Sequence, residues 1–145
     1  MGRYIETVEA KVPIEKAFNY VLDFTNVPEW DPGVTASRQI SGDGPGRGAQ
    51  YEVVAPFAGR DVTLIYTVEE LIPNERIVIE GISDRTVAKD IITFSSDPTT
   101  TWIVYEANLG LKGILKPLEF LFNGSFAKLV KRAAEGLEGA LNARK

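Results

Sequence analysis

The 145-residue chain contains no cysteine and no histidine. The absence of cysteine excludes disulfide bridges and thiolate chemistry, and the absence of histidine removes the commonest general base and the commonest zinc ligand. Any catalysis must therefore use carboxylates, tyrosines, lysines, arginines or the backbone. The acidic residues around Trp30, which are Asp23, Glu29 and Asp31, match no calcium loop and are expected to form a solvated rim. We expect neither a metal site nor a cofactor.

The chain also lacks a long hydrophobic run and an excess of positive charge. No apolar stretch is long enough to cross a bilayer, so we expect no stable membrane insertion. Residues 1–12 lack the apolar block of a signal peptide, which favours a cytoplasmic location. The formal net charge is -4 at pH 7. A nucleic-acid partner is not expected, because neutralising phosphates requires clustered lysine and arginine.

The composition that remains is that of an ordinary globular protein. Hydrophobic residues make up 44% of the chain and charged residues 25%. A chain of this length can bury roughly two thirds of its unfolded surface around one core. We find no internal repeat and no low-complexity linker. Residues 1–145 are therefore expected to form a single domain, either as a monomer or as a homodimer.

Two short helices are predicted between the first and second strands. Residues 3–10 alternate as a half-buried strand. Pro13 suits the first turn of a helix that should end near Asp23, since apolar residues recur there at helical spacing. A second short helix should hold Pro28 in its first turn and end at Trp30, because proline and glycine follow. Trp30, between these helix breakers, is expected to be either a lid over a pocket or core filling.

From Val34 onward the hydrophobic period changes to two. The clearest strand is residues 60–71, where Val62, Leu64, Tyr66 and Val68 alternate with mostly polar residues. Turn signals separate successive strands, so neighbouring strands should pair as hairpins in an antiparallel sheet. The glycine-rich residues 42–48 are interpreted as a flexible hairpin loop. A phosphate cradle is disfavoured there, because no Lys-Ser/Thr follows and no helix opens.

The last segment, from about Lys116, returns to a helical period, with Pro117 in its first turn. This long helix must lie across the apolar face of a strongly twisted, seven-stranded sheet, which can curl around it and leave a gap. That gap is the candidate binding site. Gly124 interrupts the helix at a cost of about 1 kcal/mol relative to alanine. Close packing is the preferred explanation, and the alternative is that Gly124 lets the first turns shift to admit a ligand.

Polar side chains on the inner strand faces are the most informative feature of the sequence. Arg38 and Asp90 share faces with apolar residues, and so do three tyrosines. Buried hydroxyls and charges are costly unless paired, so a cavity offering water or a polar ligand suits them. Alternatively, a strand end or a bulge brings Arg38 or Asp90 to solvent. The predicted ligand-binding residues are Trp30, Tyr51, Val53, Leu64, Tyr66, Ile79, Phe94, Tyr105, Leu118, Phe122 and Phe126.

Three stretches, in this order, carry a resemblance to a known family: VEAKVPIEKAFNYVLDFTNVPEWDPGV, YTVEELIPNERIVIEG and TTTWIVYEANLGLKG, followed by the long terminal helix. The chain resembles the START-like, or SRPBCC, superfamily, and within it the bacterial polyketide cyclase/dehydrase and lipid-transport group. The resemblance covers essentially the whole chain. It implies the α+β helix-grip fold, in which a seven-stranded antiparallel sheet wraps around a long C-terminal helix. It also implies an internal apolar cavity, entered near the loops and the short helices.

Three functions remain open from the sequence. The leading hypothesis is a carrier or sensor of a hydrophobic small molecule, such as a lipid, an isoprenoid or an aromatic polyketide, with tyrosine and arginine orienting its polar end. The alternative is a cyclase or dehydratase without metal or nucleotide, with Arg38 and Tyr66 as polarising donors and Asp90 as base. The third is a partner-binding protein of the stress-response or toxin-antitoxin kind, for which outward-facing Trp102 beside Val104 is the feature of interest.

Overall fold

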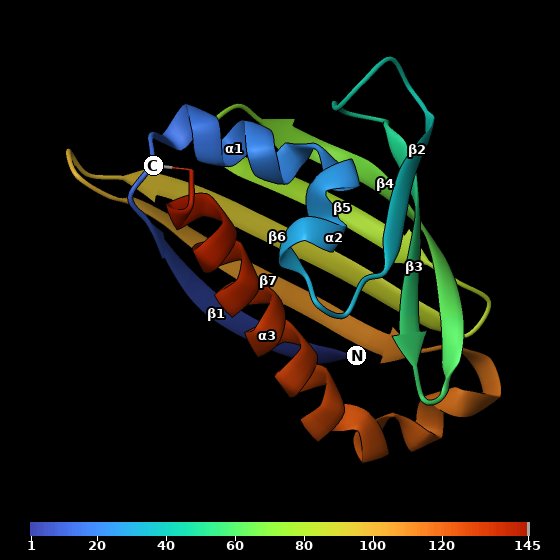
Figure 1. The fold of residues 1–145 in the computed structure, drawn as a ribbon. Helices are drawn as coiled ribbons and strands as arrows, with labels where there is room; N and C mark the ends of the chain where they lie inside the picture. The colour runs from blue at the N-terminus through green and yellow to red at the C-terminus, as the bar shows by residue number, and fades with distance from the viewer. Residues whose placement is uncertain (145) are drawn as a thin grey trace.

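One antiparallel sheet and one long C-terminal helix form the frame of the molecule (Figure 1). The structure is a computed structural model that describes residues 1–144. The elements are β1 (Gly2–Ala10), α1 (Ile14–Leu22), η1 (Phe24–Asn26), α2 (Val27–Trp30), β2 (Ala36–Ser41), β3 (Gln50–Phe57), β4 (Arg60–Ile72), β5 (Arg76–Ile82), β6 (Thr86–Ser96), β7 (Thr101–Leu111), η2 (Gly113–Phe122) and α3 (Asn123–Asn142). The predicted helix-grip architecture is confirmed.

The sheet has the strand order β1-β7-β6-β5-β4-β3-β2, and every neighbouring pair is antiparallel. Consecutive strands pair as hairpins, as the turn signals predict, while β1 closes the order by pairing with β7. Register shifts between Gln39 and Ser41 in β2, and between Val68 and Glu70 in β4, mark bulges. Bulges increase local twist, and the sheet curls around α3 (Figure 1).

The face of β2 is opposite to the one predicted. Arg38 was expected to point inward with its apolar neighbours, but Ser37 and Gln39 are the half-buried residues and Arg38 is exposed. The reason lies in polar contacts outside the strand. Ser37 Oγ donates to the carbonyl of Phe24 at 2.7 Å, and Gln39 Nε2 donates to the carbonyl of Gly44 at 2.9 Å. These bonds satisfy loop carbonyls that the hydrophobic alternation alone does not reveal.

The C-terminal helix begins later than predicted. Residues 113–122 form the 3-10 helix η2, with Pro117 inside it, and α3 starts only at Asn123. Pro117 has no N–H to donate to an intrahelical bond of either helix type. The α-helix is therefore about 30 Å long. A Cβ on Gly124 would meet nothing within 4 Å, so the preferred explanation of close packing at this glycine is wrong.

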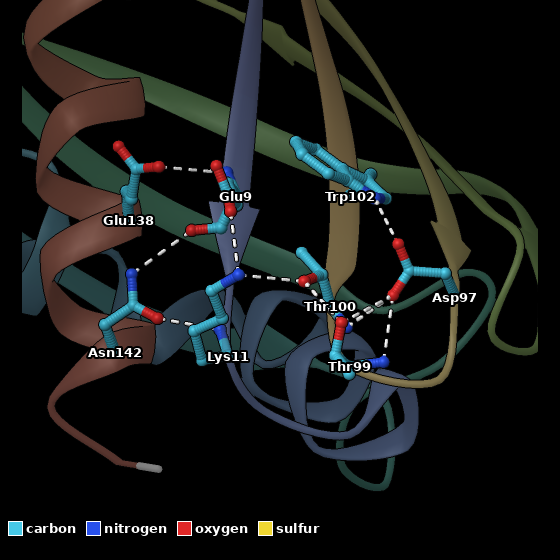
Figure 2. Close-up of polar contacts among 8 residues, drawn as sticks. All are labelled: Glu9, Lys11, Asp97, Thr99, Thr100, Trp102, Glu138 and Asn142. Atoms are coloured by element: carbon cyan, nitrogen blue, oxygen red, sulfur yellow. Dashed lines mark hydrogen bonds and ion pairs between the residues drawn. The ribbon is translucent and has the colours of Figure 1, made fainter.

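The C-terminal half of α3 is attached to β1, which is an edge strand (Figure 2). The backbone N–H of Glu9 donates to Glu138 Oε1 at 3.0 Å, and the backbone N–H of Lys11 donates to Asn142 Oδ1 at 2.7 Å. Asn142 Nδ2 returns a bond to the carbonyl of Glu9 at 3.1 Å. Edge strands expose unpaired backbone groups, and here α3 satisfies them. Lys11 Nζ also donates to Thr100 Oγ1, which ties this corner to the β6–β7 turn.

The same half of α3 is in contact with α2 at Gly136. A Cβ built on Gly136 would overlap the carbonyl oxygen of Trp30, so only glycine allows the two helices to approach this closely. Trp30 itself is 2% exposed. Its ring meets the ring of Tyr105 edge to face, with 6.1 Å between the centroids. Trp30 is therefore core filling beneath α3, not a lid.

We expect Gly136→Ala to lower the free energy of unfolding by at least about 2 kcal/mol, since the added methyl group meets backbone that cannot move aside without shifting α2. Gly139→Ala is the matched control on the same helix, where a Cβ would meet nothing within 4 Å. That variant should be neutral or up to about 1 kcal/mol more stable. Urea denaturation measures both. Equal stability of the two variants would contradict the contact.

Candidate functional site

A cavity of about 140 Å³ lies between the inner face of the sheet and α3. Most of its wall is apolar and comes from β3, β4, β6, β7 and α3. The apolar lining residues are Val34, Ala55, Pro56, Phe57, Val62, Leu64, Val87, Ala88, Ala107, Leu109, Phe126, Leu129, Val130 and Ala133. The polar lining side chains are Asp31, Tyr66, Thr86, Asp90 and Tyr105, and no lysine or arginine is found in the wall among residues 1–144.

The cavity occupies one end of the sheet. Phe57 at the end of β3, Thr86 at the start of β6, Gly110 near the end of β7 and Phe126 in the first turns of α3 all line it. These elements meet at the end of the molecule that holds η2, away from the corner where α3 is attached to β1 (Figure 1). The attached half of α3 therefore lies over filled core, and the other half lies over the cavity.

Asp90 lies in the middle of β6 with its side chain on the inner face, as the alternation of the strand predicts. The residue is 4% exposed, and Tyr105 Oη donates to Asp90 Oδ2 at 3.0 Å. Burial raises the pKa of Asp90 to about 7; the bond from Tyr105 opposes this rise and the charge of Asp31 adds to it. At neutral pH the Asp90 carboxyl is therefore present in both protonation states.

Asp31 is a second carboxyl in the wall, placed there by the end of α2. Its Oδ1 accepts a bond from the backbone N–H of Gly33 at 2.8 Å, which holds the turn that follows Trp30. Burial raises the pKa of Asp31 to about 6, against the lowering effect of the Gly33 bond. Asp31 was expected on a solvated rim with Asp23 and Glu29, and that expectation is wrong. Glu29, two positions earlier and within α2, is exposed, whereas Asp31, directly after α2, lines the cavity.

Tyr66 and Tyr105 supply two hydroxyl groups that stay protonated. Burial, with the charges of Asp90 and Asp31, raises the pKa of both phenols well above its ordinary value. The ring of Tyr66 lies across Gly81, its partner on β5, where a Cβ would come within 2.5 Å of the ring. Gly81 thus fixes the ring position. Among the described residues the Tyr66 hydroxyl has no protein hydrogen-bond partner, so it is available as a donor or acceptor.

The structure separates the predicted ligand-binding residues into two groups. Leu64, Tyr66, Tyr105 and Phe126 line the cavity together with the predicted catalytic candidate Asp90. The others lie outside the lining: Trp30, Tyr51, Val53, Ile79 and Phe94 are in the core, Leu118 is exposed, and Phe122 is half-buried against Phe57. Arg38, the other catalytic candidate, is on the surface and forms an ion pair with Glu52 at 2.9 Å.

One physical reason explains why the predicted residues in the core do not line the cavity. α1 and η1 pack on the inner face of the sheet at the end away from the cavity. Phe18 of α1 packs on Phe94 with centroids 5.1 Å apart, and Phe24 of η1 packs on Tyr51 at 5.8 Å. All four rings belong to the buried core. Alternation along a strand predicts which face of the sheet a side chain lies on. It does not predict which end of that face will be covered by a helix.

Other features bear on the remaining predictions. No helix is long and apolar enough to span a membrane within the described residues. The same residues contain no cluster of acidic side chains that could hold a metal. Trp102, Val104 and Ile5 are exposed on the outer face of β7 and β1, and Trp102 Nε1 donates to Asp97 at 3.4 Å (Figure 2). The cytoplasmic location and the partner-binding role stay predictions.

Residues 1–144 match the family model described as polyketide cyclase/dehydrase and lipid transport. The chain belongs to this family. A search of curated proteins found no match. Among solved structures, a START superfamily protein from Mycobacterium smegmatis superposes with a TM-score of 0.78 at 18% identity, covering 99% of both chains. The Zhui aromatase/cyclase from Streptomyces superposes at 0.82 with 11% identity, covering 99% of this chain and 94% of that one.

A third similar structure, a protein from Thermus thermophilus, superposes with a TM-score of 0.82 at 16% identity and covers 99% of both chains. At these identities the structural likeness shows the fold alone. Family and fold are compatible with binding of a hydrophobic ligand and with polyketide cyclase activity. The choice between the two depends on this chain's own cavity.

The raised pKa values of the two carboxyls in the wall predict a pH dependence of stability. The folded protein binds a proton at Asp90 more tightly than the unfolded chain does, because the pKa rises from 3.8 to about 7 on folding. The resulting stability is fully present below about pH 4 and is lost as the pH rises to about 7; Asp31 acts in the same direction up to about pH 6.

We therefore expect the wild-type free energy of unfolding to fall between about pH 4 and about pH 7, and Asp90→Asn to remove most of that fall, at about 1.4 kcal/mol per pKa unit. Asparagine can still accept the bond from Tyr105. Asp43→Asn, in the exposed loop after β2, is the matched control and should keep the wild-type pH dependence. Denaturant unfolding at both pH values measures the effect. Identical profiles for Asp90→Asn and wild type would show that Asp90 is not the buried acid.

Proposed function

We propose that this protein binds a small, mainly apolar molecule in the cavity beneath α3, and that the ligand presents a hydrogen-bond donor or a positive charge to Asp90 and Asp31. The observation that supports the proposal is the composition of the wall. Apolar side chains surround one buried carboxyl, Asp90, one half-buried carboxyl, Asp31, and two protonated phenols, with no basic side chain among them. Pockets of this kind, apolar with a few convergent polar groups, are typical ligand sites.

The volume limits the size of the ligand. A cavity of about 140 Å³ is close to the engineered cavity of about 150 Å³ that accepts one benzene ring. It is well below the roughly 300–1,000 Å³ of pockets that enclose drug-sized ligands. A single ring therefore fits inside. A lipid, an isoprenoid or a polyketide chain would have to extend beyond this volume.

The charges limit the chemistry of the ligand's polar end. A carboxylate or phosphate placed in the wall would lie beside Asp90 and Asp31 with no cation to compensate, and like charges in a poorly hydrated site repel strongly. An ammonium or hydroxyl group can instead donate to the carboxyls, and hydrogen bonds to charged groups are the stronger ones. We therefore favour amines and phenols or alcohols over acids. Tyrosine is retained in the proposed polar contact, whereas arginine is not, because Arg38 lies outside.

Acid–base catalysis is the second candidate function, and the pKa of Asp90 favours it. A carboxyl with a pKa of about 7 can both take up and release a proton at neutral pH. In this scheme Asp90 would remove a proton next to a carbonyl group, and the Tyr66 hydroxyl would donate a hydrogen bond to the enolate oxygen. The bond from Tyr105 holds Asp90 in place. Binding remains the leading proposal, because it requires only the contacts already described.

We expect benzylamine, which is protonated at neutral pH, to bind at about pH 8 at least tenfold more tightly than toluene, and benzoate not to bind measurably. A hydrogen bond to a charged group contributes about 1.5–3 kcal/mol, and tenfold corresponds to about 1.4 kcal/mol. Asp90→Asn should remove most of the advantage of the amine while leaving toluene binding unchanged. Isothermal titration calorimetry measures all three ligands.

Arg38→Ala is the matched control for this titration, because Arg38 was a candidate from the sequence but lies on the surface. It should bind benzylamine as wild type does. Tighter binding of benzoate than of benzylamine would overturn the proposed charge preference. Failure of all three ligands to bind would overturn the cavity as a ligand site.

A further inference from the structure

Four strongly exposed apolar side chains, including the three most exposed among the described residues, lie on η2. Ile114 is 93% exposed, Phe120 67%, Leu121 63% and Leu118 45%, and no residue of η2 is buried. Single exposed apolar residues are common on protein surfaces and require no explanation. Four within eight positions are different, because they concentrate exposed apolar surface on one short element, and large apolar patches mark interaction sites. We call this set, with Lys112 directly before η2 and Lys116 within it, the η2 surface.

The η2 surface is held in place on its inner side. Glu119 Oε1 accepts a bond from the backbone N–H of Leu111 at 2.8 Å, and Glu119 Oε2 lies 2.8 Å from the amino group of Met1. Phe122 packs on Phe57 with 5.3 Å between ring centroids. The acidic side chain of η2 is therefore directed to the end of β7 and neutralised there, while the apolar side chains stay in solvent.

Charge distinguishes this part of the chain from the rest. Residues 108–134 contain five basic residues and only one acidic residue, Glu119, although the whole chain has a net charge of -4. The five basic residues, all exposed, are Lys112, Lys116, Lys128, Lys131 and Arg132. The protein is acidic as a whole, but this segment is basic. A partner that matches the η2 surface must accept large apolar side chains and provide negative charge close to them.

We propose that the η2 surface docks on an anionic lipid bilayer. Apolar side chains of this size enter the boundary between headgroups and acyl chains, and a lysine such as Lys116 reaches lipid phosphates with its charged end. Lys112 Nζ donates to the carbonyl of Ser83 at 3.1 Å and adds positive charge beside it. A second copy of the chain fits less well, since a two-fold contact would bring the same lysines opposite one another.

Figure 1 shows η2 at the margin of the molecule, where β7 passes into α3. This is the end at which Phe57, Gly110 and Phe126 line the cavity, so docking places the cavity next to the membrane.

Vesicle flotation tests the proposal, using phosphatidylcholine vesicles with and without phosphatidylserine. We expect the wild-type protein to float with the anionic vesicles at low salt and to dissociate at high salt. The double variant Phe120→Ser with Leu121→Ser should bind them at least about tenfold more weakly, because each loses most of its apolar side chain. Lys116→Glu should weaken binding at least about fivefold to anionic vesicles only.

The matched control is Ile40→Ser with Ile82→Ser, which removes two exposed apolar side chains from β2 and β5. It should float as wild type does. Circular dichroism checks that each variant is folded. Unchanged flotation of the Phe120 and Leu121 double variant, or equal flotation on neutral vesicles, would overturn the proposal. A further result would also overturn it: the wild-type protein does not bind vesicles, sediments as a dimer, and becomes a monomer in the Phe120 and Leu121 double variant. The η2 surface would then be a contact between copies.

Discussion

The close approach of α3 to the backbone of Trp30 determines where this molecule is filled and where it is hollow. Gly136 allows the approach, and Glu138 and Asn142 fix the same half of α3 to the edge of the sheet. The other half of the helix then crosses a stretch of sheet and helix where the facing side chains are small. Ala55, Ala88, Ala107 and Ala133 all line the cavity. The twisted sheet is in contact with the helix at one end, and alanines face each other at the other end. This leaves a space that larger side chains would fill.

The contents of that space explain why it is more than a packing defect. A carboxyl buried among apolar side chains weakens a fold, and an apolar residue of similar size would usually be more stable in its place. This chain keeps a buried carboxyl, Asp90, and a half-buried one, Asp31, and orients Asp90 with a bond from Tyr105. Strongly shifted pKa values in a cavity are more frequent at functional sites than elsewhere. The stability lost by burying them is consistent with a polar ligand group that pairs with them.

The fold could be predicted from the sequence because each element carries its own signal. The change of hydrophobic period at Val34 and again near Lys116 separates strands from helix, and prolines and glycines mark the turns. Asp90, Tyr66 and Tyr105 were placed on the inner face for the same reason, since alternation along a regular strand is a local property. Arg38 was misplaced because distant carbonyls, not its neighbours in sequence, determine the face of β2.

Which part of the inner face is hollow could not be predicted from the sequence. That outcome depends on how far α1 and η1 extend over the sheet and on the contact at Gly136, and both are properties of tertiary packing. Asp31 was missed for the same reason, because its place in the cavity wall follows from how α2 meets α3. Proline at position 117 indicated a helix start but not the 3-10 geometry that leaves the η2 apolar residues exposed.

The most direct test of the site is carbon-13 NMR titration of the Asp90 side-chain carboxyl, first in the free protein and then with benzylamine. We predict a midpoint near pH 7 in the free protein. With the amine bound, the midpoint should fall, because a neighbouring positive charge favours the ionised carboxylate. A midpoint near the ordinary value for aspartate, unmoved by the amine, would show that Asp90 is solvated and that the cavity beneath α3 is not a binding site of this kind.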